Sequence, residues 1–196
     1  MNGFFEHSRL PVVGIAASAG GPAALAAILP DIPGLAAPVL VVQHLHPRFV
    51  DEFVEWMARV SALPVEAAVN AARLRRGAVY LALPGTHLKL ATGRTVVLDL
   101  DPASQHRPSA DELFRSIARH AGVDGIGVVL TGLGDDGASG LLALRRAGGA
   151  TLVQDVGSSV VHGMPGAVTR LGAAERQVAL ADMARAIRGA VRARLG

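Results

Sequence analysis

Hydrophobic residues occur along the chain in two alternating patterns. Short runs rich in valine, isoleucine and leucine predict buried strands at 12–17, 39–43, 65–69, 78–82, 87–90, 95–100, 126–131 and 151–154. Longer segments with hydrophobic residues every three or four positions predict helices at 22–29, 49–61, 109–120, 138–147, 165–171 and 181–195. The helix at 109–120 begins with a capping box, in which Ser109 precedes Glu112 by three residues.

This alternation predicts an α/β fold with a doubly wound, mainly parallel sheet and helices on both faces. Turn signals at Pro84-Gly85 and Thr92-Gly93 separate the short strands between residues 65 and 100, so we expect a small β-hairpin insertion there. A length of 196 residues suits one domain, predicted at 11–196 after an N-terminal extension at 1–10. In such sheets, functional side chains gather at the carboxyl ends of the strands.

The composition narrows the classes of function. Because the chain contains no cysteine, a disulfide framework and a thiolate metal site are excluded. The net charge of +3 is small and the arginines are dispersed, which argues against a nucleic-acid partner. No hydrophobic stretch is long enough to span a bilayer, and the N-terminus lacks the apolar core of a signal peptide. We therefore expect a soluble cytoplasmic protein without direct membrane insertion.

Three polar residues directly follow predicted strands. Ser18 follows the first strand and precedes two glycines, His44 follows the second strand, and Asp136 comes shortly after the strand at 126–131. A hydroxyl, an imidazole and a carboxylate are the parts of a nucleophile, its base and the acid that orients the base. The neighbouring glycines let backbone N–H groups approach a developing oxyanion. The pattern favours a serine-based catalytic triad.

Each of these residues also has a purely structural interpretation. Ser18 could be a turn residue before a helix, and His44 could be a hydrogen-bonded histidine at a strand end without a catalytic role. Asp136 could be the N-cap of the helix at 138–147. His46 lies two residues after His44 and is a rival base. The two histidines could begin a metal site, but no third ligand lies near them in the sequence, so no metal is expected.

Several separated segments together resemble a known family. They are GIAASAGGP at 14–22, QH at 43–44, HRPS at 106–109, TGLGDDGA at 131–138 and GMP at 163–165. With these motifs in this order, the chain resembles the catalytic domain of the CheB family, the chemotaxis protein-glutamate methylesterases. The resemblance extends from about residue 12 to about residue 180 and covers nearly the whole chain.

The resemblance implies an enzyme that hydrolyses γ-glutamyl methyl esters on the cytoplasmic helices of methyl-accepting chemotaxis receptors, releasing methanol. It also implies deamidation of particular receptor glutamines, and it requires no cofactor or metal. Ser18 would be the nucleophile, His44 the base and Asp136 the triad acid. The oxyanion and substrate contacts would fall at Ala19, Gly20, Gly132 and Leu133.

The chain departs from the family pattern at four positions near these residues. Ala19 stands where the family has threonine, Leu133 where it has methionine, Asp135 where asparagine is common, and His46 where it has proline. The departures at Ala19 and Asp135 leave open how efficient the catalysis is and which substrate is chosen. There are two alternative functions. One is a serine hydrolase of the same fold that acts on another ester or amide substrate, and the other is a catalytically silent receptor-binding domain.

Family enzymes commonly carry an N-terminal phospho-receiver domain. Only about ten residues precede the first predicted strand here, which is too few for a domain. The expectation is a stand-alone esterase that is not gated within its own chain, with a separate response-regulator protein as a candidate partner.

Overall fold

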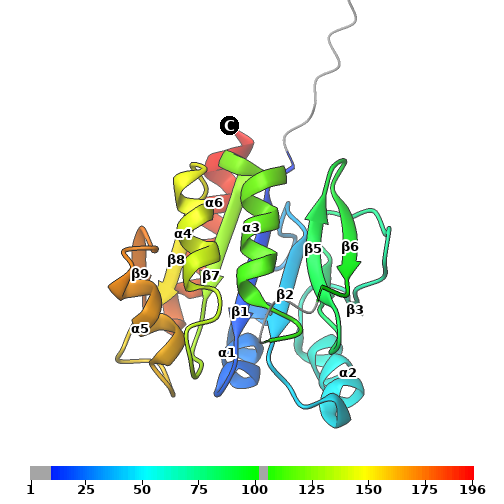
Figure 1. Cartoon of the computed structure of the whole chain (residues 1–196), viewed down its shortest axis with the longest axis horizontal. Helices are drawn as coiled ribbons and strands as arrows, with labels where there is room; N and C mark the ends of the chain where they lie inside the picture. The colour runs from blue at the N-terminus through cyan, green and yellow to red at the C-terminus, as the bar shows by residue number, and fades with distance from the viewer. Residues whose placement is uncertain (1–9, 102–105) are drawn as a thin grey trace, which may run out of the picture.

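In the part of the chain that the structure describes, seven strands form one parallel sheet, with a two-stranded hairpin beside it (Figure 1). The computed structural model describes residues 10–101 and 106–196. The order of the sheet is β3-β4-β2-β1-β7-β8-β9, and every neighbouring pair is parallel. Its strands are β1 (Val12–Ala17), β2 (Val39–Gln43), β3 (Val65–Ala67), β4 (Val79–Leu81), β7 (Gly125–Val129), β8 (Ala150–Gln154) and β9 (Arg176–Val178). The doubly wound, mainly parallel α/β class expected from the sequence is confirmed.

Helices cover both faces of the sheet. One face carries α1 (Gly21–Ile28), α2 (Val50–Val60) and α6 (Leu180–Leu195), and the other carries α3 (Ala110–His120), α4 (Ala138–Arg146) and α5 (Gly163–Arg170). Figure 1 shows α3 and α4 in front of the sheet and α6 behind it. Short 3₁₀ turns lie at Leu29–Asp31, Pro47–Phe49 and Gly122–Asp124.

Strand β1 shows how the sequence divides its side chains between the two layers. Val13 and Ile15 pack into the core under α1 and α6, whereas Val12 and Ala16 pack under α3 and α4. All six residues of β1 are buried, as expected for a central parallel strand covered on both faces.

Two paired glycines bring α3 and α4 close to the centre of the sheet. Gly14 of β1 lies opposite Gly127 of β7. A Cβ atom at Gly127 would lie 2.4 Å from Leu141 Cδ1, and one at Gly14 would lie 2.6 Å from Ile117 Cδ1. The absent side chains therefore leave room for both helices, whose first turns lie at the carboxyl edge of the sheet.

The small β-hairpin predicted from the sequence is present, but it takes in two of the four short strands expected between residues 65 and 100. Only β5 (His87–Ala91) and β6 (Thr95–Asp99) pair as an antiparallel hairpin, while the expected strands at 65–69 and 78–82 extend the main sheet as β3 and β4. The physical reason is burial on both faces, because all three residues of β4 are buried.

Strand β9 was not predicted at all. It is three residues long, occupies the edge of the sheet and exposes Arg176 and Gln177, so no hydrophobic run marks it. Within the described ranges, no helix is both long and apolar enough to cross a membrane.

Candidate active site

Ser18 lies where β1 turns into α1. Gly20 is the N-cap of α1 and has a φ of 79°, a left-handed conformation that favours glycine. Ser18 is half-buried, and its backbone N–H donates to Thr131 O at 3.0 Å, which joins it to the segment after β7. Its hydroxyl makes no hydrogen bond within the described part of the chain. The Ser18 Oγ is therefore free to act at the carboxyl edge of the sheet.

His44 lies beside Ser18 in the neighbouring strand end. Ala17 and Gln43 are paired in the β1–β2 register, so Ser18 and His44 are the next residues along each strand. His44 Nε2 is 2.9 Å from Asp136 Oδ2, while His44 Nδ1 has no hydrogen-bond partner among the residues described. The His106 ring stacks on the His44 ring, with 4.6 Å between centroids and 17° between planes. These contacts orient the imidazole and leave one ring nitrogen available.

Asp136 is held by the N-terminus of a helix that precedes it in the chain. Its carboxylate accepts hydrogen bonds from Ser109 Oγ at 2.9 Å, Ala110 N at 2.7 Å and Asp111 N at 3.0 Å. The expected N-cap role toward the helix at 138–147 is wrong, because α4 has Gly137 as its N-cap and no side-chain cap bond. The carboxylate instead compensates the free N–H groups at the start of α3.

Ser109 is the N-cap of α3, as the capping box predicted. Its Oγ accepts the Glu112 N–H at 3.4 Å, and its own N–H donates to His87 Nδ1 at 3.2 Å. Glu112 does not return a bond to Ser109 but pairs with Lys89 of the hairpin at 2.8 Å. The hairpin therefore braces the start of the helix that holds Asp136.

The surroundings of Asp136 keep its carboxylate ionised. Burial by itself would raise the pKa of Asp136. The hydrogen bonds from His44, from the Ala110 and Asp111 N–H groups and from Ser109 outweigh burial and lower the pKa to about 2. A negative charge is therefore present beside His44 throughout the neutral range.

The depressed pKa of Asp136 predicts a loss of stability in acid. Its usual pKa is 3.8, so the stabilisation by the carboxylate is fully present above about pH 4 and is lost as the pH falls toward 2. The shift corresponds to about 2 kcal/mol. Urea unfolding of the wild type and of Asp136→Asn between pH 2 and pH 6 should show their difference in free energy of unfolding shrinking by that amount. A difference that stays constant over this range would contradict the assignment.

Three backbone N–H groups near Ser18 are available to an oxyanion. The N–H groups of Ala19, Gly20 and Leu133 have no acceptor among the described residues. Gly132, which the sequence grouped with them, offers no free donor because its N–H donates to Val161 O at 3.0 Å. Gly132 instead provides space, since a Cβ there would lie 2.9 Å from the Cβ of the serine.

His46 does not occupy the position of the base. It is exposed, and its Nδ1 accepts the Arg48 N–H at 3.3 Å at the start of a 3₁₀ turn. His44 is the histidine in contact with Asp136. In the described part of the chain, no group of three or more His, Asp or Glu side chains is arranged to hold a metal ion.

Sequence reasoning assigned no role at this site to three residues that contact Ser18, His44 or Asp136. His106 and Ser109 fall within the HRPS segment, so the motif marked their position but not their contacts. Gln43, the last residue of β2, donates to the Ser18 and His44 carbonyls. Its sequence signals were its place in the QH segment and a polar side chain at the end of a hydrophobic run, and neither indicated these contacts.

The fold is that of a doubly wound α/β protein. A serine, a histidine and an aspartate, the side-chain types of a serine hydrolase, lie at the carboxyl edge of its sheet. The family model described as CheB methylesterase matches residues 13–187. The chain belongs to the CheB methylesterase family, as its motifs predicted.

Known proteins similar to this chain share most of its length. A protein-glutamate methylesterase/protein-glutamine glutaminase of Agrobacterium fabrum (strain C58) is 44% identical over 176 residues, which is 88% of this chain and 50% of that protein. A relative of the same description from Caulobacter vibrioides is 43% identical, over 90% of this chain and 52% of its own length. The chain thus spans about half the length of the curated relatives it matches.

A solved structure is similar over nearly the whole fold. The crystal structure of the Thermotoga maritima CheB methylesterase catalytic domain superposes with a TM-score of 0.88 at 31% sequence identity. The match covers 92% of this chain and 98% of that domain.

Proposed function

We propose that residues 11–196 form a protein-glutamate methylesterase domain. It hydrolyses γ-glutamyl methyl esters on the cytoplasmic helices of chemotaxis receptors to glutamate and methanol. The observation that carries this proposal is the 2.9 Å contact between His44 and the ionised Asp136, next to Ser18 in the adjacent strand end. The names of relatives 43–44% identical to this chain supply the substrate class.

In this mechanism Ser18 Oγ attacks the ester carbonyl carbon while His44 takes its proton. The proton goes to Nδ1, because Nε2 donates its hydrogen to Asp136. Asp136 holds the ring in this tautomer and stabilises the imidazolium by its charge. The imidazolium then gives the proton to the leaving methoxide, which departs as methanol.

The glutamyl-enzyme is hydrolysed by the same groups. His44 accepts a proton from water, which attacks the acyl carbon, and returns a proton to Ser18 Oγ as glutamate leaves. In both steps the N–H groups of Ala19, Gly20 and Leu133 donate to the oxyanion. The substitutions at positions 19 and 133 relative to the family pattern leave these backbone donors in place.

Deamidation of receptor glutamines follows the same route. The amide differs from the methyl ester only in its leaving group, which departs as ammonia after protonation by His44. Both relatives above carry protein-glutamine glutaminase in their names, which supports this second activity.

The test is methanol release from a receptor cytoplasmic fragment carrying γ-methyl glutamates. We expect release from the methylated fragment, ammonia release from the form with glutamines, and a clear preference over small methyl esters without receptor sequence. Equal rates on all esters would indicate a serine hydrolase with another substrate. Binding of the fragment with neither methanol release nor labelling by a fluorophosphonate would indicate a silent binding domain. Adding a phosphorylated receiver protein would test regulation by a separate partner.

A further inference from the structure

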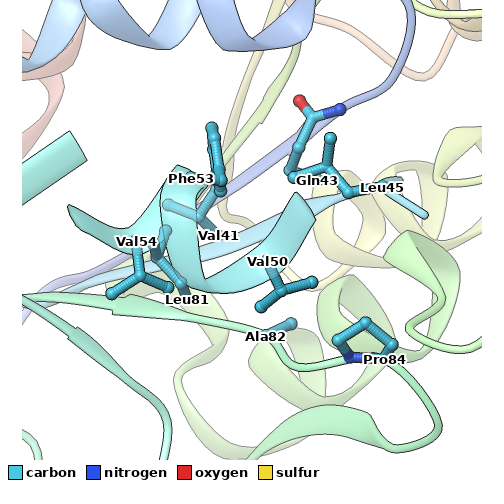
Figure 2. Close-up of a pocket in the computed structure, with 9 residues that line it drawn as sticks. All are labelled: Val41, Gln43, Leu45, Val50, Phe53, Val54, Leu81, Ala82 and Pro84. Carbon is cyan, nitrogen blue, oxygen red and sulfur yellow. The ribbon is translucent and has the colours of Figure 1, made fainter. Parts of the chain in front are cut away.

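Gln43 is a buried polar residue that stands between the nucleophile and the base. It is the last residue of β2, directly before His44 and opposite Ala17, and only 6% of its surface is exposed. Its stem borders a small, mainly apolar pocket beneath α2. Figure 2 shows its amide directed away from Val50 and Ala82 of that pocket.

The Gln43 amide joins the backbones of both reacting residues. Its Nε2 donates to Ser18 O at 2.9 Å and to His44 O at 2.9 Å. Because both partners are carbonyl oxygens, only the NH₂ end of the amide can serve them. The contacts therefore determine which way the amide points.

The other end of the amide faces the start of α1. A Cβ atom at Gly21 would lie 2.0 Å from Gln43 Oε1, so the glycine provides the room that this oxygen occupies. The Gly21 N–H donates to the same Ser18 carbonyl at 2.8 Å. The turn after β1 is therefore built around the Gln43 side chain.

Burying the Gln43 amide costs stability, which indicates that its two donated hydrogen bonds have a function. Gln43 Oε1 is buried and has no hydrogen-bond partner among residues 10–101 and 106–196, which is unfavourable for stability. An apolar side chain of the same length would avoid that cost, because it would bury no oxygen without a partner. The two donated hydrogen bonds are what such a side chain could not supply.

We propose that Gln43 is a positioning residue that sets the separation between Ser18 and His44. The β1–β2 ladder ends at the bond from His44 N to Ala17 O, 3.0 Å long, and beyond it one strand enters α1 while the other enters a loop. The amide extends the connection by one residue, to the Ser18 carbonyl. This role rests on the proposed serine mechanism, in which the distance between hydroxyl and imidazole controls the rate.

The test uses Gln43→Met, which keeps the length of the side chain and removes its donors. The first readout is the rate at which a fluorophosphonate labels Ser18, which needs no receptor. The second is the kcat and KM of methanol release. We expect labelling and kcat to fall about 10²-fold, the effect of a misplacement of roughly 1 Å, with KM unchanged. In Gln43→Glu the labelling rate and kcat should fall further, because the carboxylate would face the two carbonyl oxygens.

Thr151→Val is the matched control for a loss of stability alone. Thr151 is fully buried in β8, and its Oγ1 accepts the Glu175 N–H at 2.9 Å, away from Ser18, His44 and Asp136. This variant loses the partly buried hydrogen bond of the hydroxyl, while the Glu175 N–H keeps its bond to the Thr151 carbonyl at 2.9 Å. It should melt at a lower temperature, yet label at the wild-type rate. Gln43→Met labelling as fast as this control would overturn the positioning role.

The two readouts separate this inference from the proposed function. If the wild type is labelled but releases no methanol, the proposed substrate is wrong, and the labelling rates still decide the role of Gln43. If the wild type is neither labelled nor active, the serine mechanism and the positioning role of Gln43 are both wrong.

Discussion

Replacing Ser18 by alanine is expected to lower methyl ester hydrolysis at least about 10³-fold. The reason is chemical rather than structural, because within the described ranges the Ser18 hydroxyl makes no hydrogen bond that the fold would lose. The free energy of unfolding of Ser18→Ala should therefore stay close to that of the wild type. Methanol release and urea unfolding, measured on the same preparation, separate the two effects.

Ser61→Ala is a suitable control for this experiment. Ser61 Oγ accepts the Leu63 N–H at 3.0 Å beyond the end of α2, and Ser61 contacts none of the three proposed catalytic residues. We expect this variant to lose some stability and keep its activity. If Ser18→Ala kept activity within tenfold of the wild type, a water activated by His44 would have to be the attacking group.

Replacing Asp136 by asparagine is expected to lower kcat by about 10³ to 10⁴-fold. Asparagine removes the negative charge beside the imidazolium and replaces one carboxylate oxygen with an NH₂ group, which, when it faces His44, cannot accept the Nε2 hydrogen. The ring would then favour the other tautomer, with its hydrogen on Nδ1, and Nδ1 could no longer take the proton from Ser18. The measurement is kcat for methanol release, with fluorophosphonate labelling as a second readout.

Ser109→Ala is the comparison that isolates the charge of Asp136. It removes one donor to Asp136 Oδ1 and leaves the carboxylate and its bond to His44 in place. The loss of activity should be much smaller than in Asp136→Asn. Similar losses in both variants would mean that the start of α3, and not the charge, limits the reaction.

The sequence predicted the central strands better than the edges of the sheet. The expected strands at 12–17 and 39–43 coincide with β1 and β2, because continuous hydrophobic runs ended by a polar residue have clear limits. Strand β9 has no such run and depends on hydrogen bonds to β8. The positions of β3 and β4 likewise depend on pairing between segments that local patterns do not connect.

The sequence by itself determined that Ser18, His44 and the segment containing Asp136 follow strands, and therefore that they meet at one edge of a parallel sheet. Only the tertiary structure decided that Asp136 binds the start of α3, whose Ala110 lies 26 residues earlier, and that Gln43 joins the two strand ends. The physical reason is that strand ends follow from local hydrophobic runs. Contacts between distant segments arise only when the helices pack against the sheet and bring their polar groups together.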